Sequence, residues 1–255
     1  MRSGTIDNDL RWLSSVFNWA RRHKVEGKRL LPMNPLHDVN WPKEKNLLRP
    51  VASHSRFTDT MTVIDQIDPR GRLRCMLALA RYTGRRESAI CQLKASDVLR
   101  DAAAMRRALA DQGMDESQAD HWEHGAIQWR AASDKQGFET LAPLSKRARE
   151  GLDRYLLQNP RVAEAWLFPS PSDDSKPFRR DVAARWLLKA EKRAELPKLR
   201  GGVWHPYRRL WATERKHLPD QDVAAAGGWR DTRALKLSYQ QADPATMKSV
   251  VEAGG

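Results

Sequence analysis

Five residues offer the groups that chemistry on a phosphate requires. Arg86 follows a Thr-Gly pair, where one helix is expected to end and another to begin. His205 and Arg208 lie three residues apart and would share one face of a helix. Trp229 follows two glycines, and Tyr239 lies further along the chain. Guanidinium, imidazole and indole groups can donate hydrogen bonds to phosphate oxygens, and a tyrosine hydroxyl can act as a nucleophile.

The net charge indicates the partner on which such groups would act. The 255 residues include 45 Lys and Arg against 32 Asp and Glu, which gives a formal charge of +13. A polyanion is the expected partner of so basic a chain, because each cation placed on a phosphate also releases condensed counterions. Ribosomal proteins share this property, so charge alone does not distinguish a DNA enzyme from a basic structural protein.

Several other classes find no support in the sequence. The two cysteines, Cys75 and Cys91, imply no disulfide framework, and a reducing cytoplasm is the expected compartment. No histidine joins them at the spacing of zinc ligands, so no metal site is expected. There is no apolar run of membrane-spanning length, and neither a P-loop nor a dinucleotide-binding motif occurs. We therefore expect no cofactor and no membrane association.

The residues that could do chemistry need elements to position them, and the first such element is an N-terminal helix. Apolar residues recur at helical spacing from Ile6 to Ala20, with Thr5 placed to cap the helix. The helix ends in a basic cluster that could bind DNA phosphates or simply be solvated; the candidates for DNA contact are Arg21, Arg22 and Lys24. Prolines follow. We expect a small helical domain at 1–48 and a charged linker at 49–56.

A second domain is expected from residue 57 to residue 255. The sequence predicts a helix around 58–67, a buried helix over 73–80 that ends at Thr83-Gly84, and a further helix that carries Arg86. Residues 100–124 hold six acidic and three basic residues, which favours an insertion on a surface that does not face DNA. Two strand-like runs, 126–131 and 139–144, flank a turn and predict an antiparallel hairpin with Lys135 near its tip.

Three more helices complete the predicted domain, near 145–158, 179–194 and 206–217. The densest cationic block runs from residue 176 to residue 200, with nine basic and three acidic residues. It contains two further candidates for DNA contact, Arg179 and Arg180. The predicted fold class is mainly α: a helical catalytic domain with a small antiparallel β-sheet, preceded by a partial helical domain.

The order of these motifs resembles the tyrosine recombinase (phage integrase) family. Residues 82–88 (YTGRRES) resemble its T-G-x-R-x-S box, and residues 133–137 (SDKQG) resemble its lysine hairpin. Residues 205–208 (HPYR) match its H-x-x-R box, and Gly228-Trp229 is similar to the pair that follows. Tyr239 stands where the nucleophile is expected. Residues 5–35 resemble the last part of the family's core-binding domain, which clamps DNA.

The resemblance implies a role for each residue. Tyr239 would attack the scissile phosphate and form a covalent 3′-phosphotyrosine, which stores the energy of the bond so that no ATP is needed. Two arginines would bind the non-bridging oxygens, and Trp229 would add an N–H donor. His205 would take part in proton transfer, and Lys135 would protonate the leaving 5′-oxygen. The implied catalytic set is Arg86, Lys135, His205, Arg208, Trp229 and Tyr239.

The sequence departs from the family pattern in three places. Ala89 stands where the family usually has an acid, and Glu87 is expected on a different face of the helix. The gap from Trp229 to Tyr239 is one residue longer than usual, so either the loop bulges or Trp229 is not the counterpart. The core-binding part is shorter than in the family.

These features predict a site-specific DNA recombinase that works as a homotetramer on double-stranded DNA, associated with the nucleoid, with an accessory directionality protein as a further potential partner. Two alternatives stay open. One is a type IB-like topoisomerase, which shares the phosphotyrosine chemistry. The other is a catalytically impaired DNA-binding remnant of an integrase, which Ala89 and the short clamp would favour.

Overall fold

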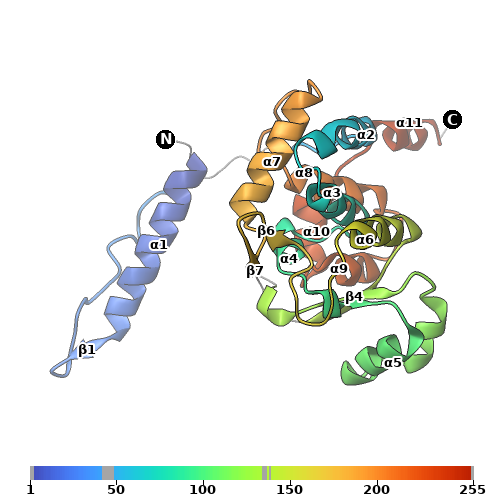
Figure 1. Cartoon of the computed structure of the whole chain (residues 1–255). Helices are drawn as coiled ribbons and strands as arrows, with labels where there is room; N and C mark the ends of the chain where they lie inside the picture. Colours follow the sequence, from blue (N-terminus) through green and yellow to red (C-terminus); the bar gives the residue numbers. More distant parts are fainter. Residues whose placement is uncertain (1–2, 42–48, 134–136, 138, 254–255) are drawn as a thin grey trace. The chain divides into compact units, whose positions relative to one another are not determined.

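The chain folds into two units, each described here by itself. The computed structural model describes residues 3–41, 49–133, 137 and 139–253. Residues up to Leu48 form the first unit, and residues from Arg49 onward form the second (Figure 1). Lys135 lies outside the described residues.

The first unit is a long amphipathic helix followed by a tight hairpin. Helix α1 (Ser3–Arg22) leads into strands β1 (Lys24–Val25) and β2 (Lys28–Arg29), which pair antiparallel. The helix begins before Thr5, so the prediction that Thr5 caps it is wrong. Asn34 is buried and its side-chain amide donates to Ser14 Oγ and Asn18 Oδ1, which fastens the chain after the hairpin back onto α1.

The second unit begins with residues that pack tightly, contrary to the predicted linker at 49–56. Ala52 is 2% exposed, and its N–H donates to the carbonyl of Pro206. Ser53 caps helix α2 (His54–Val63), which continues into the 3₁₀ turn η1 (Ile64–Gln66). Arg56 is also buried. Its charge is compensated there by two hydrogen bonds that it donates to the buried carboxylate of Glu191.

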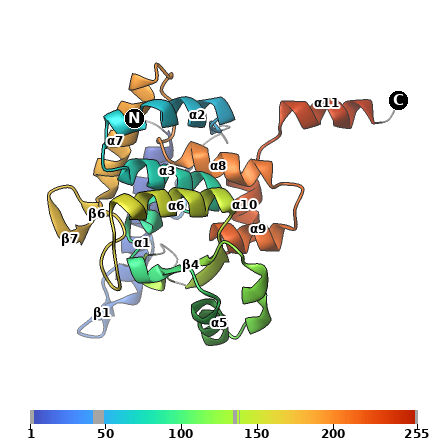
Figure 2. The same ribbon diagram turned by 45° about the vertical axis from the view of Figure 1, so that its right-hand side comes forward.

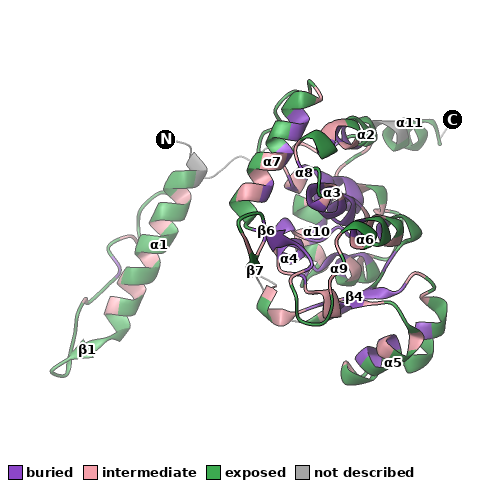
Figure 3. Ribbon diagram, in the orientation of Figure 1, coloured by how far each residue is buried: buried purple, intermediate pink, exposed green. Residues whose placement is uncertain are grey.

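The core of the second unit is built around helix α3 (Arg72–Thr83). Its residues from Leu73 to Ala80 are nearly all buried, as the nearly all-apolar run predicts (Figure 3). Helices α6 (Lys146–Gln158) and α8 (His205–Glu214) pack on α3. Helix α3 ends at Thr83. The next residue, Gly84, has a φ of 67°, which lies in the left-handed region that favours glycine. The predicted stop at Thr83-Gly84 is confirmed.

A short helix and a three-stranded sheet follow. Helix α4 (Glu87–Cys91) has Arg86 as its N-cap, and the 3₁₀ turn η2 (Ala95–Asp97) leads into strand β3 (Val98–Leu99). Strands β4 (Ala126–Trp129) and β5 (Thr140–Pro143) pair antiparallel, with Ala126 opposite Pro143. The predicted hairpin is confirmed, and β3 adds a third strand beside β4 that the sequence analysis did not foresee.

Residues between β3 and β4 form a small subdomain of their own. Helix α5 (Ala102–Asp111) and the 3₁₀ helix η3 (Glu116–His121) share a minor apolar cluster around Met105 and Leu109 with the sheet. The helical interpretation of 100–124 is therefore confirmed.

The remaining elements complete the unit. Strands β6 (Pro169–Ser170) and β7 (Asp173–Pro177) form a second hairpin, and α7 (Arg180–Arg193) packs on α2. Helices α9 (Asp220–Gly227) and α10 (Thr232–Ser238) pair, while α11 (Pro244–Glu252) stands away from the other helices (Figure 2). Helices dominate and the sheets are small and antiparallel, so the predicted fold class is confirmed.

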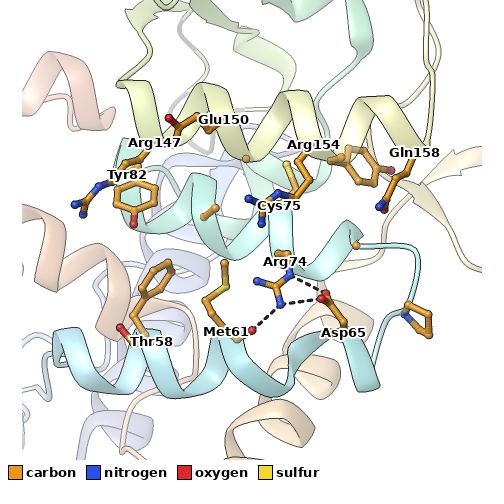
Figure 4. A pocket seen from close by; sticks show the side chains of 16 residues that line it. Thr58, Met61, Asp65, Arg74, Cys75, Tyr82, Arg147, Glu150, Arg154 and Gln158 are labelled. Carbon is orange, nitrogen blue, oxygen red and sulfur yellow. Dashed lines mark hydrogen bonds and ion pairs between the residues drawn. The ribbon is translucent and has the colours of Figure 1, made fainter.

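A cavity of about 670 Å³ lies between α2, α3 and α6 (Figure 4). In it Arg74 donates to the carboxylate of Asp65 and to the carbonyl of Met61. None of the residues that line this cavity belongs to the predicted catalytic set.

Candidate active site

Arg208 lies at the centre of the site and is almost completely buried. Its guanidinium donates to the carbonyls of Gly84, Gly227 and Gly228, the last two at 2.7 and 3.4 Å. These carbonyls stand at the C-terminal ends of α3 and α9, where the helix dipoles favour a cation. Burial, and next to it the charge of Arg86, lowers the pKa of Arg208 to about 9. The guanidinium is therefore still charged at neutral pH, and its Nε has no hydrogen-bond partner among the described residues.

Two consecutive arginines enter the site from the turn between α3 and α4. Arg86 is half-buried, and its Nη1 lies 3.5 Å from the carbonyl of Gly228, which Arg208 shares. Arg85 is 3% exposed and donates to the carbonyls of Ala225 and Ala226 at the end of α9. Arg86 thus lies beside Arg208, while Arg85 ties α9 to the rest of the site.

Tyr239 follows the last residue of α10 and meets Trp229. Their rings make an edge-to-face contact with centroids 4.9 Å apart. The guanidinium of Arg208 lies 3.5 Å from the centroid of Trp229 and 5.1 Å from that of Tyr239. The indole Nε1 of Trp229 is buried and has no partner among the described residues. Helix α10 occupies most of the segment between the two residues, and Trp229 lies next to Tyr239.

His205 opens α8 and faces the same aromatic ring. Its ring centroid lies 6.4 Å from that of Tyr239. Burial lowers the pKa of His205, Glu87 acts to raise it, and Arg209, Arg208 and Arg180 act to lower it further. The imidazole is therefore mainly neutral at pH 7, as a proton acceptor must be.

Glu87 is the first residue of α4, and its charge acts on His205. It is 7% exposed, and its carboxylate accepts a hydrogen bond of 2.8 Å from Arg180. Because α4 begins at Glu87 itself, the residue belongs to the first turn and its direction does not follow from helical spacing after Arg86. An acid thus acts on His205 even though Ala89 stands at the usual position.

The other three tyrosines are unsuited to act as nucleophiles in this site. Tyr155 and Tyr207 are at most 3% exposed, and burial raises the pKa of each phenol. Tyr207 also donates to Glu191 in the core. Tyr82 lies on α3 and lines the cavity of Figure 4. Tyr239 is the tyrosine that lies beside Arg208.

The position of Lys135 stays a prediction, but its flanks are described. A hollow between the β4–β5 hairpin and helices α9 and α10 is lined by Gly137, Thr140 and Trp229. A second hollow is lined by Ser133, by Arg180 of α7 and by Arg179, which caps that helix. Two described residues of the connection between β4 and β5, Ser133 and Gly137, therefore line hollows that also contain Arg180 and Trp229.

The five predicted DNA contacts divide between the two units. Arg21, Arg22 and Lys24 are exposed at the end of α1 and on β1. Arg179 pairs with Asp181 at 3.0 Å, and Arg180 pairs with Glu87. The first three belong to the first unit and the last two to the second. No group of three or more potential metal ligands occurs among the described residues, and no described helix is long and apolar enough to cross a membrane.

Comparison with known proteins identifies the family. The sequence profile of the phage integrase family matches residues 57–245. The chain belongs to this family. Membership supports a site-specific tyrosine recombinase, an enzyme that cleaves and rejoins DNA. Among proteins with curated functions, none matches the sequence.

Solved structures of recombinases share the fold of this phage integrase family member. The XerH recombinase in a post-cleavage complex with palindromic difH superposes with a TM-score of 0.71 at 15% identity, over 99% of this chain and 67% of that one. A lambda integrase dimer bound to a COC′ core site gives 0.65 at 19% identity, over 94% and 74%. The Tn1549 transposon integrase in complex with a circular intermediate DNA gives 0.63 at 14% identity, over 100% and 80%.

The charges around His205 predict how its pKa responds to substitution. Glu87→Gln removes the contribution that raises the pKa of His205 and leaves those of Arg180, Arg208 and Arg209, so the pKa should fall further. Titration of the imidazole Cε1 proton by NMR measures the change. Arg179→Gln is the matched control, because Arg179 pairs with Asp181 and is not among the charges that act on His205. An unchanged or raised pKa in Glu87→Gln would contradict the arrangement.

Proposed function

We propose that the chain is a site-specific DNA recombinase whose nucleophile is Tyr239. The observation that carries the proposal is the convergence of one tyrosine, two arginines, a histidine and a tryptophan from four separate segments. Tyr155 and Tyr207, by contrast, are buried in the core. The relatives named above are recorded in complexes with DNA, which supports duplex DNA as the substrate.

The proposed cleavage step is a transesterification. The phenolic oxygen of Tyr239 bonds to phosphorus while the bond from phosphorus to the 5′-oxygen breaks. Neutral His205 accepts or relays the phenol proton, and Lys135 donates a proton to the departing oxygen. The product is a 3′-phosphotyrosine and a free 5′-hydroxyl. Attack by a second 5′-hydroxyl reverses the step and joins a new strand, so the number of phosphoester bonds is conserved.

The guanidinium groups act on charge that develops at phosphorus. Arg208 and Arg86 share the carbonyl of Gly228 and lie beside each other, so two cations can meet one phosphate. Trp229 adds an N–H whose partner would be a non-bridging oxygen, since it has none among the described residues. A donor that is already in position loses little conformational entropy when the transition state forms.

The proposed assembly is a homotetramer on two paired DNA sites, located on the nucleoid. A tetrameric lambda integrase on a Holliday junction shares the fold, with a TM-score of 0.63 at 18% identity. An accessory protein that sets the direction of the reaction is a further proposed partner.

Trapping the covalent adduct tests the function. A duplex nicked near the recognised site loses a short fragment after cleavage, so rejoining is prevented and the adduct accumulates on a denaturing gel. Adduct with strand exchange between two sites supports a recombinase. Relaxation of supercoiled DNA without site preference or pairing of sites would support a topoisomerase instead. Binding without adduct would leave a DNA-binding remnant, the alternative that Ala89 favours.

A further inference from the structure

The first residues of the second unit, 49–52, are fastened to the candidate site by side chains that the proposed chemistry does not use. We call residues 49–52 the entry segment, because it directly follows the N-terminal unit in the chain. Arg209 Nη1 donates to the carbonyl of Pro50 at 3.0 Å, and Gln241 Nε2 donates to the carbonyl of Arg49 at 2.5 Å. The N–H of Ala52 donates to the carbonyl of Pro206 at 3.1 Å.

These bonds reach both sides of the site. Pro206 and Arg209 belong to α8 and flank the family's second arginine, whereas Gln241 lies two residues after the nucleophile. The entry segment therefore joins the helix that supplies His205 and Arg208 to the segment that supplies Tyr239.

Thr213 of α8 makes two further hydrogen bonds, one with Tyr239 and one with Gln241. Its hydroxyl donates to the carbonyl of Tyr239 at 3.2 Å and accepts from the N–H of Gln241, also at 3.2 Å. The backbone on the C-terminal side of Tyr239 is thus bonded to α8, and the side chain of Gln241 bonds the same segment to Arg49. Tyr239 is the C-cap of α10: its N–H donates to the carbonyl of Leu235, whereas its own carbonyl accepts from Thr213 outside the helix.

Arg209 is placed for a role that core packing does not explain. It is 2% exposed, and its Nε has no partner among the described residues. Burial lowers the pKa of Arg209, Arg49 lowers it further, and Tyr239 acts to raise it. A buried cation that is not fully hydrogen-bonded is costly. Arg209 donates to the entry segment at the carbonyl of Pro50, and it lies on the same helix as Thr213, which donates to the carbonyl of Tyr239.

We propose that Gln241 and Arg209 are positioning residues that couple the entry segment to Tyr239, so that the nucleophile is held for attack only while residues 49–52 are in place. The proposal rests on the proposed function, because it requires Tyr239 to be the nucleophile. Because residues 49–52 directly follow the N-terminal unit in the chain, a displacement of Arg49 would be passed to the segment after Tyr239 through the side chain of Gln241.

Gln241 offers the sharper test, because its half-exposed side chain makes a small contribution to folding. Gln241→Ala removes the amide donor, and Gln241→Glu keeps the shape but offers acceptors only. Gln241→Lys restores a donor that can reach the carbonyl of Arg49. Adduct formation is measured in single turnover at saturating DNA, together with DNA affinity and Tm. Gln240→Ala is the matched control, since the neighbouring glutamine has an amide nitrogen with no partner among the described residues.

We expect the Ala and Glu variants to form adduct about 10- to 100-fold more slowly, because displacement of about 1 Å has effects of this size. DNA affinity and Tm should be unchanged, Gln241→Lys should recover part of the rate, and Gln240→Ala should match the wild type. A wild-type rate in Gln241→Ala overturns the proposal. An equal loss in Gln240→Ala, or a loss that follows a lowered Tm, overturns it as well.

Two controls separate this proposal from the proposed function. If Tyr239→Phe still forms adduct, or the wild type forms none, the proposed function fails. Amide hydrogen exchange over residues 236–243 then tests whether Gln241 orders the segment around Tyr239. Faster exchange in Gln241→Ala than in the wild type supports the positioning proposal, and unchanged exchange overturns it. If adduct depends on Tyr239 but not on Gln241, only the positioning proposal fails.

Discussion

Replacing Tyr239 by phenylalanine is expected to abolish the covalent protein–DNA adduct and to leave DNA affinity nearly unchanged. The substitution removes a single oxygen, the atom proposed to bond to phosphorus. The ring stays and can keep its contact with Trp229 at 4.9 Å and its place beside Arg208. Binding to the phosphate backbone depends on cations that the substitution does not alter. Denaturing gels measure the adduct, and fluorescence anisotropy measures affinity.

Tyr82→Phe is the matched control for this result. Tyr82 is half-buried on α3, lines the cavity of Figure 4 and lies outside the proposed catalytic set, so its variant should form adduct at the wild-type rate. Adduct that persists in Tyr239→Phe would transfer the assignment to another tyrosine. Tyr155 and Tyr207 would then have to leave the core, which faster amide hydrogen exchange around them in the complex would reveal.

A substrate with sulfur in place of the bridging 5′-oxygen is expected to restore cleavage to Lys135→Ala and not to Arg208→Ala. An alkoxide is a poor leaving group and needs a proton, which an ammonium with a pKa of about 10.4 can give when positioned. A thiolate is far less basic, since the reference thiol has a pKa of about 8.5, and departs unprotonated. The general acid therefore becomes unnecessary with this substrate.

The arginine variant should stay defective because its task is different. Arg208 would stabilise charge on the non-bridging oxygens, which the sulfur does not touch, and loss of one such donor lowers the rate about 100- to 1,000-fold. Arg86→Ala should behave in the same way. Cleavage rates on the oxygen and sulfur substrates give the comparison for all three variants. Rescue of all three, or of none, would reduce Lys135 to a residue that only binds DNA.

Local signals in the sequence predicted the elements that carry the site, and non-local contacts account for what they missed. The apolar run over 73–80 and the glycine after Thr83 act within one helix, so their effect could be foreseen. The β4–β5 hairpin was foreseen because a turn joins its strands. Strand β3 is only two residues long, and its partner Ile127 lies 29 residues further on, so no local pattern marks it.

Residues 49–56 also make contacts with residues far away in the chain, which no local pattern indicates. Charge and the preceding proline predicted a linker, whereas the structure buries Ala52 and pairs Arg56 with Glu191. The partners of this segment, Glu191, Pro206, Arg209 and Gln241, stand more than 130 residues away in the chain. The direction of Glu87 does not follow from the sequence alone for a different reason: it depends on where α4 begins, and a boundary shifted by one or two residues changes the face.

The proposed catalytic set was found through the order of the motifs. The structure brings Arg86, His205, Arg208, Trp229 and Tyr239 together, but their proposed roles still await the experiments above. Arg85 escaped notice because it is the neighbour of the motif arginine. Its two bonds to the end of α9 become visible only when α9 is placed beside α3.

The carbonyls that hold Arg208 have a consequence for the thermodynamics of DNA binding. A free arginine side chain carries about 2 kcal/mol of rotamer entropy, which a flexible phosphate-binding residue loses when it meets its ligand. In this chain the guanidinium is already fixed by Gly84, Gly227 and Gly228. The side chain of Arg208 lost its rotamer entropy when the chain folded. It therefore loses little further entropy when it binds a phosphate. The entropic penalty at this position is carried by the stability of the domain and not by its affinity for DNA.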